Sequence, residues 1–357
     1  MPGRIILVLI LLLAACAPRG ALTMAPEGVP LGTVERIYIA SNRDAQGQRH
    51  EAVSFGRIDV SVPPQRQPGS IPYPEPGRAP DPRRDFLVSQ FARFPGDAAF
   101  RDDLRHALAA RKPGDRDVVL FVHGYNNTFA EGLYRFAQFQ HDLQLPGVGM
   151  HYSWPSSGEA LAYAADRDSV LYSRDGLVRS IRLAAQANPG GKLILVGHSM
   201  GAELMMESLR QMAIAGDRRT LDRIGAVVLL SPDIDIGLFR MQAKAIGTLP
   251  QPFIIFTSGK DKALNLSSLI SAESARLGNL TDARPVADLP VTLVDTGAYS
   301  TGSGHFNVAT SPALMRILTK AREMSDLLSS DRTGLGPLAQ AALHVERAAQ
   351  IVIPAGF

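Results

Sequence analysis

The chain has 357 residues, and its 37 lysines and arginines against 34 aspartates and glutamates give a formal net charge of +3. Charged residues make up 20% and hydrophobic residues 45%, a balance that excludes a disordered or fibrous protein. The small charge, with no run of five basic residues, argues against a nucleic-acid partner. The single cysteine excludes an intramolecular disulfide and a cysteine-based zinc site.

The first sixteen residues are typical of an export signal. Arg4 is the only charge before an apolar run over residues 5–15, which is shorter than the roughly twenty residues that a membrane-spanning helix needs. The run ends in Leu13-Ala14-Ala15-Cys16, which resembles the bacterial lipobox, where small residues precede a lipidated cysteine. An ordinary signal peptide is the alternative. We favour lipidation because the only cysteine stands where the lipobox requires it.

Residues 1–15 are therefore the predicted lipoprotein signal, and cleavage would leave a mature chain of 357 − 15 = 342 residues. The resemblance implies acyl chains on Cys16 that anchor the protein in the bacterial cell envelope. Ala17 follows, instead of the aspartate that commonly marks inner-membrane retention, which favours the outer membrane. Residues 16–31 are expected to be a tether.

Residues 32–112 are predicted to hold two strands, a long loop and a helix. The β-branched segments 34–40 and 56–62 are typical of strands. Residues 63–82 are dense in proline and glycine and predict an extended surface loop. Residues 97–111 have apolar positions at helical spacing.

Over residues 113–329 short apolar stretches alternate with helical patterns. Strands are predicted at 118–122, 149–153, 193–196, 226–230, 253–256 and 291–294. Helices are predicted at 128–143, 159–187 (with a break near Arg174), 199–212 and 312–328. The alternation indicates an α/β fold with a parallel sheet covered by helices on both faces, in one domain over 32–329. Residues 330–357 form an alanine-rich tail, expected to be helical over 339–351.

The strongest functional signal is Gly197-His198-Ser199-Met200-Gly201, which follows a predicted strand and precedes a predicted helix. This is the setting of a nucleophile elbow, in which a strained turn presents a serine. Glycines are needed there because side chains would clash with the strand and the helix that meet at the turn. A chance match in a glycine-rich loop is the alternative, and the setting favours Ser199 as a nucleophile.

A serine hydroxyl needs a base and an orienting acid before it can attack. Two histidines follow Ser199 in the chain, His305 and His344. His305 lies in a glycine-rich loop between the last predicted strand and the final helix, whereas His344 lies in the tail. We therefore predict His305 as the base, with a solvated surface histidine as the alternative.

Three aspartates could orient that histidine. Asp261 directly follows the strand at 253–256, which would place its carboxylate at the carboxyl edge of the sheet. Asp233 and Asp235 follow the preceding strand and remain alternative acids, although Asp233 would also serve as a helix cap. We prefer Asp261. Asp295 also ends a strand but is too near His305 in sequence.

Acyl transfer further needs hydrogen-bond donors for the developing oxyanion. The segment His123-Gly124-Tyr125-Asn126 ends the first core strand, and the backbone N–H groups of Tyr125 and Met200 are the predicted donors. A simple tight turn is the alternative for this segment. His123 is expected to orient the loop. Further neighbours of the site without an assigned catalytic role are His198, Trp154, Tyr163 and Asp166.

These segments resemble a bacterial branch of the α/β-hydrolase superfamily with esterase-like or lipase-like members. The likeness spans about residues 34–328 and also includes Asn42-Arg43, Ser153-Trp154-Pro155 and Gly259-Lys260-Asp261. The resemblance implies an eight-stranded, mostly parallel sheet, a Ser-Asp-His triad, no metal and no cofactor.

The expected function is cleavage of a small-molecule or lipid ester by a serine hydrolase through an acyl-enzyme. A membrane-tethered binding or scaffold protein without useful turnover is the alternative, because fold alone does not give function. The intact serine, histidine and acid argue against it. The motifs do not separate esterase, lipase, thioesterase and peptidase activity, and they indicate no oligomeric state. Residues 159–187 and 232–250 are expected to wall the acyl pocket.

Overall fold

A computed structural model describes residues 19–159, 161–271, 276–300, 302–318, 343–345 and 347–353 of the chain. The predicted signal peptide and the predicted lipidation site Cys16 lie outside the described residues. So does the greater part of the C-terminal tail.

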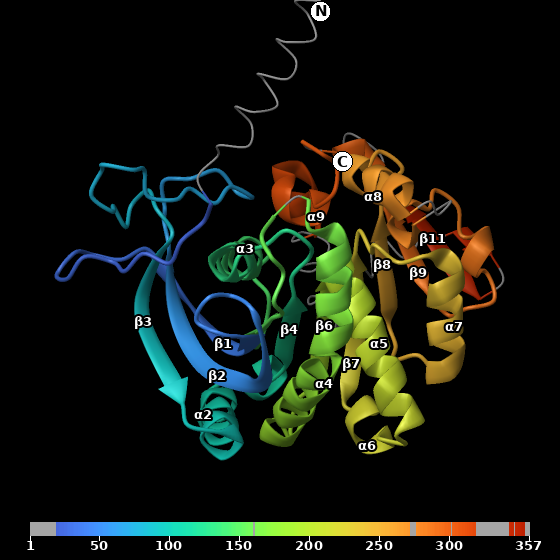
Figure 1. The fold of residues 1–357 in the computed structure, drawn as a ribbon, viewed down its shortest axis with the longest axis horizontal. Coiled ribbons are helices and arrows are strands. Elements are labelled where there is room, and N and C mark those ends of the chain that lie inside the picture. The colour runs from blue at the N-terminus through green and yellow to red at the C-terminus, as the bar shows by residue number, and fades with distance from the viewer. Residues whose placement is uncertain are drawn as a thin grey trace, which may run out of the picture.

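One sheet runs through the described part of the chain in the order β10-β11-β9-β8-β7-β6-β4-β5-β1-β2-β3 (Figure 1). Its strands are β1 (Thr33–Arg43), β2 (Arg49–Val62), β3 (Leu87–Phe94), β4 (Val118–Val122), β5 (Val148–Ser153), β6 (Leu193–His198), β7 (Ile224–Leu230), β8 (Phe253–Thr257), β9 (Thr292–Asp295), β10 (Leu343–Val345) and β11 (Ala348–Val352). The eight central strands of this order, β11-β9-β8-β7-β6-β4-β5-β1, pair in parallel with their neighbours. At the edges, β10 pairs antiparallel with β11, β2 with β1, and β3 with β2. The prediction of a mostly parallel α/β sheet is confirmed.

The sheet has three strands more than the eight that the resemblance implies. All eight predicted strands are present, and β3, β10 and β11 are additional. The helix expected over 339–351 is wrong. Residues 343–345 of this range form β10, and residues 348–351 belong to β11, which pairs in parallel with β9. Ala348 and Ile351 are buried against the sheet, so tertiary pairing overrides the helix preference of an alanine-rich segment.

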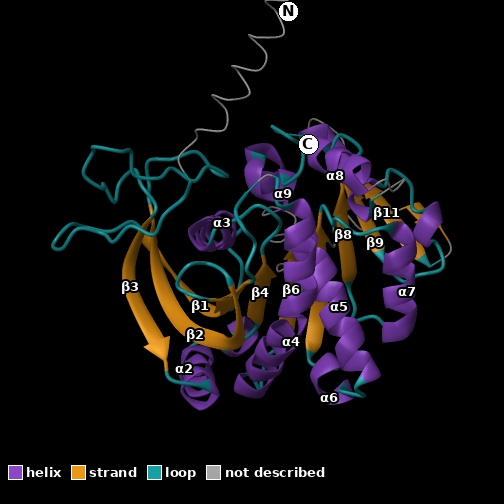
Figure 2. Ribbon diagram, viewed as in Figure 1, coloured by secondary structure: helices purple, strands orange, loops and turns teal. Residues whose placement is uncertain are grey.

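Helices cover both faces of the sheet (Figure 2). One face packs against α2 (Asp97–Ala109), α4 (Tyr163–Ala187), α5 (Met200–Ile214) and α7 (Ile236–Ile246). The other packs against α3 (Phe129–Asp142), α9 (Asn307–Thr310) and the helical residues 312–318. Two further helices complete the described set, the short α6 (Arg218–Leu221) and α8 (Lys262–Ser271).

Strand β4 shows why both faces are covered. Val118, Leu120 and Val122 belong to the apolar core on one side, and Val119 and Phe121 to the core on the other. Side chains alternate between the faces of a strand, so an unbroken apolar strand requires helices on both sides.

Several helices differ from the predictions. Helix α4 runs through Arg174 without the expected break. Helices α6, α7 and α8 were not predicted. None of the helices in the described ranges is long and apolar enough to span a membrane.

Candidate active site

Ser199 lies on a strained turn between β6 and α5. Its backbone angles are φ 53° and ψ −123°, a region that residues with a side chain rarely occupy. A Cβ atom on Gly197 would lie 2.8 Å from Cα of Ala202, and one on Gly201 would lie 2.3 Å from the carbonyl oxygen of His123. The turn therefore requires glycine at both positions, which is the geometry of a nucleophile elbow.

His305 is hydrogen-bonded to Asp261. Its Nδ1 lies 2.8 Å from Oδ2 of Asp261, which is fully buried. The other carboxylate oxygen, Oδ1, accepts the backbone N–H groups of Ala263 and Leu264 at 3.0 Å each. Because a carboxylate at Nδ1 holds the imidazole ring in one orientation and one tautomer, Nε2 is left for other partners. His305 and Ser199 line the same cavity.

The two alternative acids have other partners. Asp233 accepts hydrogen bonds from the Tyr163 hydroxyl at 3.0 Å and from the Ser267 hydroxyl at 2.8 Å. Its Oδ1 also lies 3.1 Å from Nε of Arg276, and both side chains are buried. Asp235 caps α7 by accepting the Leu238 N–H at 2.9 Å. The structure thus places Asp261 against His305, whereas Asp233 and Asp235 contact other residues that hold neighbouring segments together.

The loop after β4 packs directly on the elbow. A Cβ atom on Gly124 would lie 2.7 Å from Nδ1 of His198 and 2.9 Å from Cβ of Ser199, so the loop touches the serine. Tyr125 follows and lines the cavity with Ser199. Met200 is the first residue of α5, where backbone N–H groups have no partner within the helix. Both predicted oxyanion donors therefore lie next to Ser199.

Beneath this loop, His123 and Trp154 form a buried support. The two rings stack with 5.1 Å between centroids, and the indole N–H donates to the His123 carbonyl oxygen at 2.7 Å. Nδ1 of His123 lies 2.8 Å from the Gly124 carbonyl oxygen. Burial and the nearby Arg43 charge hold the pKa of His123 well below its ordinary value, which favours the uncharged ring. These contacts fit the expectation that His123 orients the loop.

Arg43, at the end of β1, is a residue to which the sequence assigned no role. Its guanidinium donates to the carbonyl oxygens of Ser156 at 2.8 Å and Asn127 at 2.9 Å, and to the Ser153 hydroxyl at 3.0 Å. Burial lowers its pKa to about 10, which leaves it charged at neutral pH. Arg43 therefore ties the ends of β1 and β5 to the loop after β4. The sequence signal that could have pointed to this role of Arg43 is a charged residue at the end of an apolar strand.

His198 and Glu203 are two further buried titratable groups near the elbow. The ring of His198 stacks on Phe306 at 3.9 Å between centroids, and burial holds its pKa well below its ordinary value. It is a packed neighbour, as expected. Glu203, on α5, lies 3.3 Å from Arg167, and burial raises the pKa of Glu203 to about 7.

The cavity at the serine has a volume of about 270 Å³. It is lined by Tyr125, Asn126, Tyr163, Ser199, Asp233, Ala263, Leu264, Leu266, Ser267, Ile270 and His305. Residues 159–187 contribute Tyr163, as expected. The expectation that 232–250 form a wall is wrong beyond Asp233, because α7 packs against α5 and the core. Helix α8 forms that wall instead.

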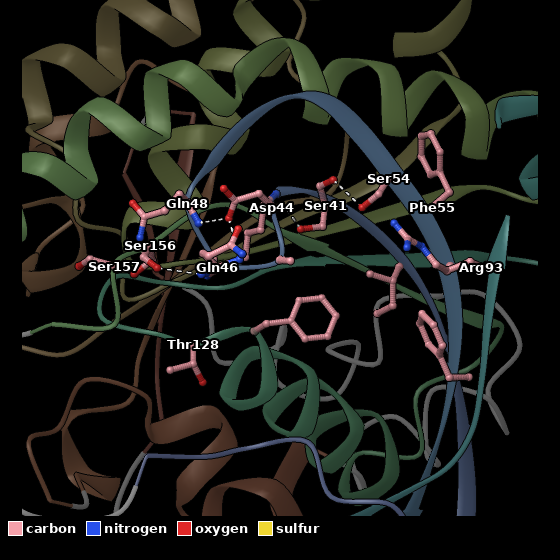
Figure 3. A pocket seen from close by; sticks show the side chains of 17 residues that line it. Ser41, Asp44, Gln46, Gln48, Ser54, Phe55, Arg93, Thr128, Ser156 and Ser157 are labelled. Atoms are coloured by element: carbon pink, nitrogen blue, oxygen red, sulfur yellow. Dashed lines mark hydrogen bonds between the residues drawn. The ribbon is translucent and has the colours of Figure 1, made fainter. Parts of the chain in front are cut away.

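A larger cavity of about 590 Å³ lies beside the β1–β2 hairpin and is a poorer candidate (Figure 3). Its hydroxyl and carboxylate groups are used locally: Ser41 donates to the Ser153 carbonyl oxygen at 2.9 Å, and Asp44 accepts the N–H groups of Gln46 and Gln48. No histidine is among the described residues that line it. The smaller cavity is lined by the serine and the histidine, which makes it the candidate active site.

The parallel sheet, the elbow and the adjacent Asp–His pair define an α/β hydrolase. Residues 97–322 match the family described as alpha/beta hydrolase of unknown function (DUF900), and the chain belongs to this family. Among the described residues, no cluster of three or more histidine, cysteine, aspartate or glutamate side chains could hold a metal ion.

A curated relative is an uncharacterised protein of Nostoc sp., which is 34% identical over 127 residues. The alignment covers 29% of this chain and 33% of the relative, so the chain matches about a third of that protein's length.

Solved structures of hydrolases show a distant likeness to the fold. A Trichoderma reesei cutinase has a TM-score of 0.23 at 19% identity, over 38% of this chain and 66% of its own. A lipase-esterase related protein of Clostridium acetobutylicum has a TM-score of 0.28 at 14% identity, over 69% of this chain and 88% of its own. A fungal esterase of Rhizomucor miehei has a TM-score of 0.36 at 14% identity, over 84% of this chain and 87% of its own. At TM-scores below 0.5, these likenesses carry no weight for activity.

Proposed function

We propose that this α/β hydrolase cleaves carboxylic esters through an acyl-enzyme formed on Ser199. The observation that carries the proposal is the hydrogen bond of 2.8 Å between buried Asp261 and His305, which lines the same cavity as Ser199 on its strained turn. Membership of a hydrolase family supports hydrolysis in general. The ester substrate and the catalytic roles of Ser199, His305 and Asp261 are the part that we propose.

In the proposed first step, Ser199 Oγ attacks the ester carbonyl carbon while Nε2 of His305 takes the hydroxyl proton. Asp261 stabilises the imidazolium that forms. The backbone N–H groups of Tyr125 and Met200 bind the oxyanion of the tetrahedral intermediate. Collapse of this intermediate breaks the bond to the alcohol, which leaves with the proton from His305. A water molecule deprotonated by His305 then attacks the acyl-enzyme, and Ser199 is restored with the release of the acid.

The cavity favours a substrate with an apolar acyl group. Leu264, Leu266 and Ile270 from α8 supply an apolar wall beside Ser199. The volume of about 270 Å³ lies just below the usual range for small-molecule sites, about 300–1,000 Å³. A short acyl group fits inside, and a longer one would extend through the mouth.

We further propose that acyl chains on Cys16 hold the mature enzyme on the bacterial cell envelope, with the outer membrane preferred. The support is the Leu13-Ala14-Ala15-Cys16 sequence and Ala17 after it.

The experiment that tests the proposed activity compares Ser199→Ala with wild type on a chromogenic short-chain ester and a fluorophosphonate probe. We expect wild type to turn over the ester and to be labelled at Ser199, and the variant to do neither while keeping its circular dichroism spectrum. Ser268→Ala, a matched change on α8 outside the cavity lining, should keep both properties. Folded wild type that neither turns over ester nor reacts with the probe would favour the scaffold alternative.

A further inference from the structure

One exposed apolar face borders the mouth of the proposed catalytic cavity. Leu266 and Ile270 of α8 line the cavity, yet they are 58% and 56% exposed. Leu269, on the same helix, is 78% exposed. Positions i, i+3 and i+4 share one face of a helix, so these three residues form a single apolar rim at the mouth. We call Leu266, Leu269 and Ile270 the α8 rim.

Helix α8 presents this rim from a fixed position. Its first turn is held by Asp261, which accepts the N–H groups of Ala263 and Leu264. Its middle is held by the hydrogen bond of 2.8 Å from Ser267 to Asp233. Since buried partners fix the inner side of α8, exposure of the rim is a property of the fold. Clustered exposed apolar side chains of this kind mark interaction sites.

The N-terminal segment is fastened beside the same cavity. Arg19 donates to the side-chain and the backbone oxygen of Asn126, each at 2.9 Å. The Gly20 N–H donates to the Glu131 carboxylate at 3.1 Å, and the Gly20 carbonyl oxygen accepts the Thr128 hydroxyl at 3.2 Å. Asn126 itself lines the catalytic cavity. The chain therefore arrives at Arg19 in contact with the loop that carries the proposed oxyanion donor.

The short distance along the chain limits where Cys16 can lie. Cys16 precedes Arg19 by three residues, and three residues of fully extended chain span at most about 11 Å. This limit holds for every conformation of the intervening residues. With the length of the Arg19 side chain and its hydrogen bond of 2.9 Å added, an acylated Cys16 at a bilayer surface would keep the Asn126 loop within roughly two nanometres of the lipid headgroups.

We propose that the lipid anchor at Cys16 and the α8 rim together set the mouth of the cavity against the bilayer. The substrate is then an ester of a lipid in the same membrane, whose acyl chain passes from the bilayer into the cavity. Lys260 and Lys262 are exposed where α8 begins and suit the phosphates of anionic headgroups. This inference rests on the proposed ester hydrolysis and on the proposed lipidation.

The test uses the full chain, isolated with its anchor and reconstituted into vesicles of phosphatidylethanolamine and phosphatidylglycerol. A fluorogenic phospholipid ester in the vesicles is compared with p-nitrophenyl acetate in solution. Leu269→Asp, which changes a rim residue outside the cavity lining, should lower vesicle turnover at least tenfold and leave soluble turnover within twofold. The matched control Ile214→Asp changes a residue that is 64% exposed at the far end of α5, some 22 Å along the helix from Ser199, and should change neither rate.

The outcomes separate the inference from the function on which it rests. If Leu269→Asp and wild type cleave the vesicle ester equally well, the membrane-facing mouth is overturned and the ester hydrolase stands. If wild type cleaves neither substrate, the proposed function itself fails.

A second measurement tests the contact directly, with an environment-sensitive fluorophore attached to the new thiol of Leu269→Cys or Ile214→Cys. Vesicles should shift the emission to the blue at 269 and leave that at 214 unchanged. Aqueous emission at both positions would overturn the proposal. So would a shielded probe at 269 in the absence of vesicles, because it would indicate a protein occupant.

Discussion

The hydroxyl of Tyr163 donates a hydrogen bond to the carboxylate of Asp233 at 3.0 Å, and joins α4 to the segment after β7 at the cavity that holds Ser199. The same carboxylate contacts Ser267 of α8 and buried Arg276. Asp233 therefore holds the wall of the cavity, whereas Asp261 holds His305. The two carboxylates should differ in what their loss affects.

Replacement of the two acids by asparagine should give opposite phenotypes. We expect Asp261→Asn to lower kcat by roughly 10³–10⁴-fold, because the imidazole loses its orienting charge. Asp233→Asn breaks the buried ion pair with Arg276, which should cost about 3–5 kcal/mol of unfolding free energy, with kcat changed less than about tenfold. Steady-state kinetics on a soluble ester and urea unfolding measure both. The reverse pattern would assign the orienting role to Asp233.

The glycines of the elbow should tolerate no side chain. In Gly201→Ala the new Cβ atom would lie 2.3 Å from the His123 carbonyl oxygen and 2.6 Å from that of Val122, and neither backbone atom can move without disrupting β4. We expect a loss of at least about 2 kcal/mol in unfolding free energy. Gly190→Ala is the control, because its Cβ atom would meet nothing within 4 Å and should change stability by less than about 0.5 kcal/mol. Equal stability of the two variants would contradict this account of the turn.

Glu203 should make stability fall as the pH rises. Burial raises its pKa from 4.5 to about 7 in the folded protein, so the unfolded chain ionises first. The contribution of Glu203 is fully present below pH 4.5 and is lost as the pH rises through about 7, by an amount on the order of 3 kcal/mol. Urea unfolding at pH 5 and pH 8.5 should show this loss in wild type and not in Glu203→Gln.

Glu159→Gln is the matched control for the pH experiment, since Glu159 is exposed. It should follow the pH dependence of wild type. If Glu203→Gln also follows it, burial of the Glu203 carboxyl does not govern this part of the pH profile.

The proposed lipidation predicts a defined mature N-terminus. Mass spectrometry of the membrane-extracted protein should find Cys16 as the first residue with acyl chains attached, and Cys16→Ser should leave the precursor of 357 residues uncleaved. Ala17→Asp should move the protein from the outer-membrane to the inner-membrane fraction. A free Cys16 thiol in the mature protein would contradict the lipid anchor.

Much of the fold was predictable because the relevant signals are local. Apolar strands alternating with helical patterns predict a parallel sheet, and all six strands expected from them are present, as are the two strands predicted from the β-branched segments 34–40 and 56–62. Strand β11 was missed because Ala348–Val352 becomes a strand only through pairing with β9. Helix α8 was missed as the cavity wall because its position depends on Asp233 and Asp261, which come from two different loops.

The sequence by itself determined the elbow, since the steric demand for glycine on both sides of Ser199 acts between neighbours in the chain. Only the tertiary structure decided which carboxylate contacts His305. Asp233, Asp235 and Asp261 all follow strands that end at one edge of the sheet, and no local pattern separates them. In the fold, Asp233 contacts Arg276 and Tyr163, Asp235 caps the start of α7, and Asp261 is hydrogen-bonded to His305. The choice is tertiary because a hydrogen bond reaches only about 3 Å, and only the packing of distant loops brings its two atoms that close.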